Sequence, residues 1–364
     1  TVMPLMRESV ISGILVGLGL SGTTLSALAI PRAGIGWDAG IDSFAAQNVR
    51  GVDDSSPLSQ AYEQVFSTSE FYGVLVQWTS EFAYALFGGD SSLATDFVVS
   101  YQLQAVVSLT MSFASAVIAG LVVFQLFSSR VAGAFVFATI STLPYLSGMA
   151  IINFKDAPIA AGTTMVSAGA AVLWRSRDWR WLIAATGLIA TGTFFALGVR
   201  IGAWILIGGV LLINAIAMTL WRIRSTRPVP LIAPTLASAL GVGVGLTGLW
   251  LLNPIARIDL PRWAWDAYLV SRSYPWIGDV RTMGRDLPST DLPWWYLPAW
   301  FFAQLPVLFL GFALLGVVVW IWLLLREISG SRSMSLDSPR PRAVALTPFA
   351  VQALVLPAGM VIIG

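Results

Sequence analysis

The feature of the sequence that most restricts its fold is a series of long stretches without a charged residue. Such stretches of eighteen or more residues are long enough for an α-helix to cross about 30 Å of hydrocarbon. There are nine of them, at residues 9–31, 97–129, 131–154, 157–174, 181–199, 201–221, 228–256, 292–325 and 343–364. With 56% hydrophobic and only 11% charged residues, the composition differs from that of a soluble domain. The sequence therefore predicts an integral membrane protein.

We interpret all nine stretches as helices. An open strand cannot satisfy its backbone hydrogen bonds in lipid, and the chain lacks the repeated alternation of about ten residues that a membrane barrel requires. The expected fold is an all-α polytopic bundle of about nine spans, forming a single transmembrane domain over residues 1–364. Because the last stretch ends on Gly364 without a closing polar residue, we expect further helices beyond it.

The distribution of basic residues predicts how the bundle is oriented, because cytoplasmic connections carry an excess of Arg and Lys. If the N-terminus is cytoplasmic, twelve arginines and four acidic residues lie inside, and nine basic and fifteen acidic residues lie outside. The inside then has a net charge of +8 and the outside −6. The two long connections, residues 32–96 and 257–291, are both outside, where we expect the functional residues.

Part of the first outer connection has the pattern of a surface helix. Within residues 57–87, apolar side chains recur at steps of three and four, while Gln77, Ser80 and Glu81 occupy other faces. The apolar positions are Phe71, Val74, Leu75, Trp78, Phe82 and Leu86. This pattern predicts an amphipathic helix that lies in the outer membrane interface and does not span it.

Two residue types are absent, and their absence excludes several kinds of chemistry. The chain has no cysteine and no histidine, which rules out disulfides, zinc-thiolate sites, Cys or Ser–His nucleophiles and imidazole acid–base catalysis. Any chemistry must use carboxylates, arginines or the single lysine. The basic residues lie at the ends of apolar stretches and form no continuous stripe, so we expect no nucleic acid as a partner.

A few charged residues stand out within the outer connections. Asp38 and Asp42 follow the first span at a spacing that places both carboxylates on one face of a helix. Lys155, the only lysine, precedes Asp156 between two spans, and Arg200 interrupts a long apolar stretch. A lysine in such a place suits a phosphate or a carboxylate. The alternatives are a loop or capping role for the aspartates and a lysine that extends to the membrane interface.

The second outer connection mixes arginines, including Arg281 and Arg285, with tryptophans. Such a mixture suits a polyanion, a sugar face or lipid headgroups. Trp294, Trp295 and Tyr296, at the start of a span, are more typical of an interfacial aromatic belt. The pairs Gly13/Gly17 and Gly241/Gly245 are expected to be helix-packing positions.

Four motifs occur in an order that is similar to a known family. They are the "WD" after the first span, "YALFGGD" after the interfacial helix, the "NFKDAP" turn, and "YPWIG" followed by "GRD" and "DLPWWYLPAW". Together, over residues 8–305, they resemble the GT-C superfamily of membrane glycosyltransferases, in particular its bacterial protein-mannosyltransferase-like branch, also called glycosyltransferase family 39-like. In that branch the turn commonly has the sequence "NPKDIPFA".

The resemblance implies transfer of a sugar from a polyprenyl-phosphate donor to a lipid, glycan or protein acceptor at the outer face of the bacterial plasma membrane. It implies Asp38 as the catalytic carboxylate, with Asp42 second, and Lys155, Asp156 and Arg200 in the donor pocket. Arg281 and Arg285 are further candidates for substrate binding. The one candidate cofactor is a divalent metal, although Ala39 replaces the acid that often follows the first aspartate in the family.

Two other functions are compatible with the sequence. One is transport of a lipid or solute, although all nine stretches lack the charge midway along a span that transport sites usually contain. The other is a non-catalytic membrane subunit of a larger complex.

Overall fold

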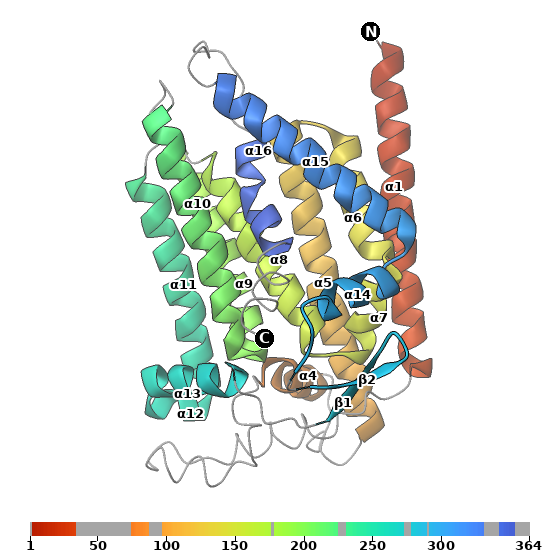
Figure 1. Ribbon diagram of the computed structural model, residues 1–364, viewed down its shortest axis with the longest axis vertical. Coiled ribbons are helices and arrows are strands. Elements are labelled where there is room, and N and C mark those ends of the chain that lie inside the picture. Colours follow the sequence, from red (N-terminus) through yellow and green to blue (C-terminus); the bar gives the residue numbers. More distant parts are fainter. Residues whose placement is uncertain are drawn as a thin grey trace.

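The computed structural model describes residues 2–33, 74–86, 97–175, 178–224, 231–272, 278–289, 291–330 and 342–353. Within these ranges the protein is a bundle of long helices with short helices and one β-hairpin gathered at one end (Figure 1). We call this the lower end, as it is drawn in Figure 1, and the opposite end the upper end. An all-α membrane bundle is confirmed by this architecture.

The long helices run alternately down and up the bundle (Figure 1). They are α1 (Val2–Ala29), α5 (Phe97–Phe127), α6 (Arg130–Thr142), α8 (Asp156–Leu173), α9 (Trp179–Val199), α10 (Trp204–Arg224), α11 (Ile232–Leu252) and α15 (Val307–Gly330). The connections that the sequence assigns to the outer side meet at the lower end, and those assigned to the inner side meet at the upper end. That the lower end faces outward remains a prediction.

In the described part of the chain, six helices are long and apolar enough to cross a membrane, or seven if α6 and the following α7 (Pro144–Ile152) form one bent span. The six are Glu8–Arg32, Val98–Phe127, Trp179–Val199, Ile201–Ile223, Ile232–Leu252 and Phe309–Ser329. With the bent α6–α7 pair counted for residues 131–154, two of the nine expected spans are not among these helices. Residues 157–174 form α8, whose alanines, glycines and hydroxyls keep its hydropathy lower, and residues 343–364 are described only as far as 353.

The break between α6 and α7 has a clear local cause. Leu143 has an extended backbone (φ −66°, ψ 113°) because it precedes Pro144, which disfavours the helical conformation. The two axes differ by 48°. The sequence showed one apolar stretch here, and the structure divides it into two helices.

The centre of the bundle is α8, which packs mainly against α5 and α9. Fourteen of its eighteen residues are buried, and most of them are alanine, glycine, serine or threonine. These small side chains allow close backbone approach, as at Gly162 and Gly192, where a Cβ on Gly162 would lie 2.6 Å from the carbonyl oxygen of Gly192. The α9–α11 contact uses Gly241 and Gly245 in the same way, which confirms that expectation. The matching expectation for Gly13 and Gly17 finds no support in the described residues, none of which lies within 4 Å of a Cβ built at either position.

Acidic residues at the upper end hold the first turns of helices. Glu8 on α1 accepts hydrogen bonds from the Arg130 N–H (3.2 Å) and the Ser129 hydroxyl (3.5 Å) at the start of α6. The carboxylate of Glu327 on α15 accepts from three successive N–H groups at the start of α16 (Arg342–Ala345), at 2.8–3.2 Å. A carboxylate at a helix N-terminus also interacts favourably with the helix dipole. The two acids therefore join helices that are distant in sequence.

The lower end carries the short elements. These are α4 (Leu75–Leu86), α12 (Pro254–Ile258), α13 (Leu260–Arg272), α14 (Tyr296–Gln304) and the antiparallel strands β1 (Asp279–Thr282) and β2 (Arg285–Pro288). A two-residue turn with positive φ at Met283 (51°) and Gly284 (78°) joins the strands, as type I′ hairpin turns require.

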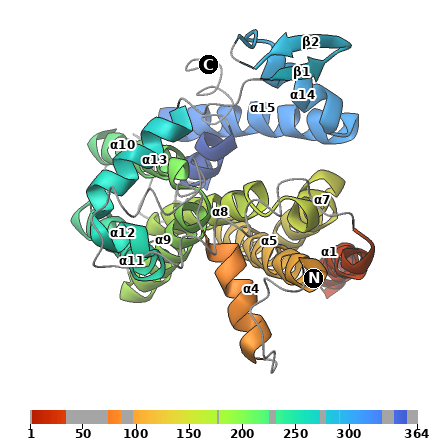
Figure 2. The same ribbon diagram turned by 90° about the horizontal axis from the view of Figure 1, so that it is seen from below.

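Helix α4 forms where the sequence predicted an amphipathic helix, but its buried residues differ from the predicted apolar face; that it lies in a membrane interface stays a prediction. Val74 and Leu75 are buried, as are Gln77 and Ser80, whereas Phe82 is 65% exposed. The first turn is inserted against α5 and α9, and the rest of the helix projects away from the bundle (Figure 2). The N-terminal half of α4 is therefore anchored in the bundle, and the C-terminal half projects from it. The spacing of apolar residues in the sequence does not distinguish these two halves.

Candidate functional site

The turn that carries Lys155 is fixed by the side chain of Asn153. Its Oδ1 accepts hydrogen bonds from the backbone N–H of Lys155 (3.0 Å) and of Asp156 (2.9 Å), and its Nδ2 donates to Asp156 Oδ2 (2.9 Å). Asp156 is exposed in the first turn of α8, where its charge favours the helix dipole. Asn153 therefore supplies the side-chain acceptor for the N–H groups at the start of α8, and Asp156 in turn holds the Asn153 side chain.

Arg200 lies at the corresponding corner on the next pair of helices. It ends α9, with its N–H bonded to the Ala196 carbonyl (3.0 Å), and its own carbonyl accepts from Ala203 at the end of the 3₁₀ turn η4 (Ile201–Ala203). Both Lys155 and Arg200 are half-buried. Each also makes further interactions within the protein.

The same buried cluster adjoins both cations. Phe154, directly before Lys155, and Val199, directly before Arg200, both belong to it, together with Leu75 and Val76 of α4. Helix α4 covers the end of α9 so closely that a Cβ on Gly198 would lie 3.0 Å from the Leu75 side chain. Lys155 and Arg200, 45 positions apart in sequence, therefore each directly follow a residue of one apolar cluster at the lower end.

The other predicted residues are placed differently. Asp38 and Asp42 lie outside the described residues. Arg281 is on β1 and forms an exposed ion pair with Asp286 (3.9 Å), and Arg285 lies opposite Thr282 in the hairpin. The hairpin is attached to α14 by a hydrogen bond from Trp300 Nε1 to Thr282 Oγ1 (3.1 Å). In Figure 2 it lies on the far side of the bundle from α4, so the structure does not bring these arginines to Lys155 and Arg200.

The aromatic residues of the second outer connection divide into two groups. Trp263 on α13 is fully buried, in a cluster with Ile255 of α12 and Ile201 of η4, so it belongs to the core. Trp294 is 72% exposed, as an interfacial belt residue would be. Partial burial raises the pKa of Tyr296, at the start of α14, above its usual value of 10.0, so its phenol stays protonated near neutral pH.

Asparagine caps are the feature of this end that sequence reasoning missed. Asn253 repeats the arrangement of Asn153, with its Oδ1 accepting from the N–H groups of Ile255 (3.0 Å) and Ala256 (3.3 Å) at the start of α12. The signal was present in the sequence, because Asn253 stands directly before α12 and Asn153 three residues before α8, where an asparagine side chain replaces a missing backbone partner.

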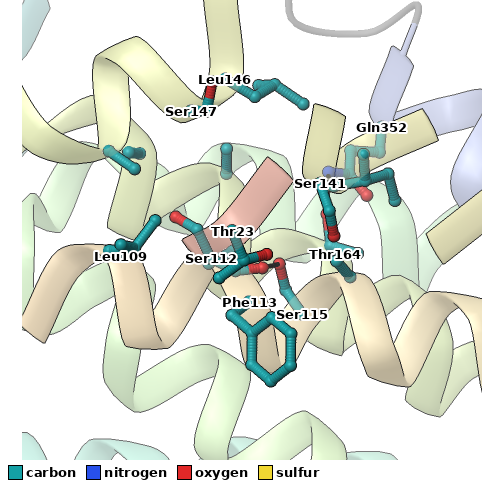
Figure 3. A pocket seen from close by; sticks show the side chains of 16 residues that line it. Thr23, Leu109, Ser112, Phe113, Ser115, Ser141, Leu146, Ser147, Thr164 and Gln352 are labelled. Atoms are coloured by element: carbon teal, nitrogen blue, oxygen red, sulfur yellow. Dashed lines mark hydrogen bonds between the residues drawn. The ribbon is translucent and has the colours of Figure 1, made fainter. Parts of the chain in front are cut away.

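A cavity of about 240 Å³ lies deeper in the bundle, beside α8. Its walls come from α1, α5, α6, α7, α8 and the segment that follows α16 (Figure 3). The lining residues are Thr23, Leu109, Ser112, Phe113, Ser115, Ala116, Ile140, Ser141, Leu146, Ser147, Ala150, Ala157, Ala160, Ala161, Thr164 and Gln352. None of them is ionisable, and most of the wall is apolar.

Metal binding finds no support in the described ranges, which contain no group of three or more acidic residues that could hold an ion. The buried side chains in these ranges likewise include no Asp, Glu, Lys or Arg. In the described part of the chain, charged chemistry is therefore confined to the ends of the bundle.

Comparison with known proteins found no matching family model, no matching curated protein and no matching solved structure. What the chain does is therefore inferred from its own residues and their placement.

Proposed function

We propose that the protein is a membrane glycosyltransferase that transfers a sugar from a polyprenyl-phosphate donor to an acceptor at the outer face of a bacterial plasma membrane. The observation that supports this proposal is that Lys155 and Arg200 each directly follow a residue of one apolar cluster, Phe154 and Val199, at the end of the bundle where the long connections lie. A phosphate on a hydrocarbon carrier requires cations beside an apolar surface at the membrane boundary. The order of the four motifs supports the same activity.

In the proposed chemistry, two cations act on the departing phosphate and a carboxylate acts on the acceptor hydroxyl. When the bond between sugar and phosphate breaks, positive charge develops on the anomeric carbon and negative charge on the departing phosphate. Lys155 and Arg200 stabilise the phosphate, and the carboxylate of Asp38 removes the proton from the acceptor hydroxyl. Asp156 acts indirectly, since with Asn153 it holds the turn that presents Lys155.

The test compares donor binding by three variants of the purified protein. Lys155→Ala and Arg200→Ala are each expected to weaken binding of a labelled polyprenyl-phosphate sugar by about 1.5–3 kcal/mol, the range of a charge-assisted hydrogen bond. Arg262→Ala is the matched control, because Arg262 is exposed on α13 and pairs with Asp266 (3.7 Å) in its own helix. Equal donor affinity in all three variants would contradict the proposal.

A second measurement concerns the base. Asp38→Asn keeps the size of the side chain but removes its basicity, so transfer at saturating donor should fall about 10²-fold or more while donor binding persists. Asp42→Asn should cost less. A near-normal rate in Asp38→Asn would show that another group takes the proton.

A further inference from the structure

The turn between α8 and α9, at the upper end of the bundle, places two arginines on tryptophan rings. The guanidinium carbon of Arg175 lies 5.6 Å from the centre of the Trp181 ring, and that of Arg180 lies 5.8 Å from the centre of the Trp179 ring. A cation is attracted to the electron-rich face of an aromatic ring. An arginine that is stacked by its face keeps the N–H groups at its edge for other partners.

The two pairs differ in their exposure. Arg175 is half-buried, donates a hydrogen bond to Gln125 Oε1 of α5 (2.9 Å) and therefore fastens the turn to the bundle. Arg180 is exposed, and Trp179 beneath it is 65% exposed. Because α9 can span a bilayer and begins at Trp179, this second pair lies where the span meets the membrane boundary.

Helix α15 repeats the arrangement. The guanidinium carbon of Arg326 lies 5.5 Å from the centre of the ring of Trp322, one helical turn earlier, and both side chains are exposed. This helix can also span a bilayer, and the pair lies toward its upper end (Figure 1). Two spans that are distant in sequence therefore each carry an exposed Arg–Trp pair at the same end of the bundle.

The acidic residues of the upper end do not neutralise these arginines. In the described ranges they are Glu8, Asp178 and Glu327, and each accepts a hydrogen bond from a backbone N–H at the start of a helix. Asp178 accepts from the backbone N–H of Arg180 (3.1 Å) and not from its guanidinium. Among the residues that the structure describes, none forms an ion pair with Arg180 or Arg326.

Charge and position together define the partner. An exposed guanidinium binds phosphate through paired N–H groups, and tryptophan is favoured at the level of lipid headgroups. We propose that the two exposed pairs, Arg180 with Trp179 and Arg326 with Trp322, bind the headgroups of anionic phospholipids. The lipid phosphate lies on the guanidinium edge, and the tryptophan ring lies against the ester region beneath it. A zwitterionic lipid binds less well because it brings no net negative charge.

This inference is independent of the proposed transferase. The arginines concerned are at the upper end, and Lys155 and Arg200 are at the lower end. Anionic lipid can occupy either leaflet, so the inference also holds whichever side the upper end faces. Loss of lipid preference would leave the transfer assay unaffected, and a failed transfer assay would leave the lipid preference in place.

Site-specific quenching in nanodiscs tests the inference, and a chain without cysteine allows one reporter at a time. Ile183→Cys, labelled with a bimane fluorophore, places a reporter one helical turn from Arg180, where the native side chain is 61% exposed. Val318→Cys does the same for the α15 pair, and Leu251→Cys is the control at the lower end of α11. Each full-length protein is placed in phosphatidylcholine nanodiscs that contain an equal fraction of brominated phosphatidylglycerol or brominated phosphatidylcholine.

The expected result is a local preference for the anionic lipid. At the reporters beside the two pairs, local occupancy by phosphatidylglycerol should exceed that by phosphatidylcholine about fivefold, the effect of one arginine near an anionic surface. At the control reporter on α11, phosphatidylglycerol should quench no more strongly than phosphatidylcholine.

Four variants make the result specific, and all replace exposed side chains, so that folding is expected to persist. Arg180→Gln and Arg326→Gln should each remove the preference at the reporter beside it. Trp179→Leu leaves the charge unchanged but removes the ring under the guanidinium, so the preference should fall about twofold. Arg262→Gln, on α13 at the lower end, is the matched control and should change nothing.

Three outcomes would overturn the inference. Equal quenching by the two lipids beside the pairs would mean that the arginines meet water or an acidic protein. An equal preference at the control reporter, or one that persists in Arg180→Gln and Arg326→Gln, would mean that anionic lipid gathers around the whole protein. A preference that is unchanged in Trp179→Leu would show that charge alone acts and that the pairs are not binding sites.

Discussion

Helices α8 and α15 represent two different ways of being a membrane helix. In α15 the most apolar eighteen-residue window has a mean hydropathy of 2.2 and none of it is buried within the described protein. In α8 fourteen of eighteen residues are buried, yet the helix falls outside the set that hydropathy selects. The more apolar helix faces lipid, and the less apolar one is enclosed by protein.

The difference shows what hydropathy measures in this chain. Lipid is as apolar as leucine, so burying leucine against another helix gains little over leaving it in lipid. Association instead depends on close packing, which small side chains allow. Hydropathy therefore selects helices that can lie in lipid but does not measure their burial, since α5 has the same mean hydropathy of 2.2 as α15 and is 44% buried. In α8 a high content of Ala, Gly, Ser and Thr accompanies its central position.

The largest contrast is expected from truncating one leucine in each helix. Leu173 on α8 is 1% exposed, and Leu315 on α15 is 59% exposed. Leu173→Ala should destabilise the protein by about 2 kcal/mol or more, because it leaves a cavity in a packed interior, whereas Leu315→Ala should change stability little. Thermal unfolding of both variants in one detergent measures the contrast. Equal losses would mean that α15 packs as tightly as α8.

A smaller contrast is expected from replacing one glycine by alanine at the contact between α8 and α9, and one on α15. A Cβ on Gly192 of α9, which faces α8, would lie 2.8 Å from the backbone nitrogen of Val166, whereas one on Gly316 of α15 meets nothing within 4 Å. Gly192→Ala should cost about 1–3 kcal/mol by overpacking. Gly316→Ala should be neutral or slightly stabilising, because alanine favours helix more than glycine does. Chemical denaturation in mixed micelles compares the stability of the two variants. An unchanged stability of Gly192→Ala would show that the contact between α8 and α9 can accommodate a methyl group.

The smallest expected effect concerns the contact that ties α15 to the bundle. Glu327→Gln removes the charge that receives the N–H groups of residues 342–344. We expect a local loss of about 1 kcal/mol, which corresponds to roughly fivefold faster amide exchange at these residues without global unfolding. Asp178→Asn, which alters the cap of α9 at the same end, is the control. Unchanged exchange in Glu327→Gln would show that other contacts hold α16.

The sequence predicted the helical membrane fold and most of the long helices, because these depend on hydrogen bonding in lipid. The side of the membrane on which each connection lies stays a prediction. The sequence did not predict the break at Leu143, since Pro144 in an apolar stretch is compatible with a kinked helix as well as with two helices. It also placed Trp263 among surface aromatics, because a tryptophan beside charged residues has the same local pattern whether it faces lipid or core.

The candidate site was predictable only in part. Lys155 was conspicuous as the only lysine, and Arg200 as the only charge in a long apolar stretch. That both adjoin one buried cluster depends on how α8, α9 and α4 pack, which no local pattern contains. That Asp156 lines a donor pocket stays a prediction; the structure shows its carboxylate accepting a hydrogen bond from Asn153 at the start of α8. The cavity has no motif, because its lining comes from six separate segments.

The break at Leu143 makes the cavity adjustable. Ile140 and Ser141 line it from one side of the break, and Leu146 and Ser147 from the other. A continuous helix would form a single rigid wall, whereas two segments joined at one extended residue form a wall with a joint. A rotation about the Leu143 backbone would change the distance between these two parts of the wall. The shape of the cavity therefore depends on the two backbone dihedral angles of a single residue.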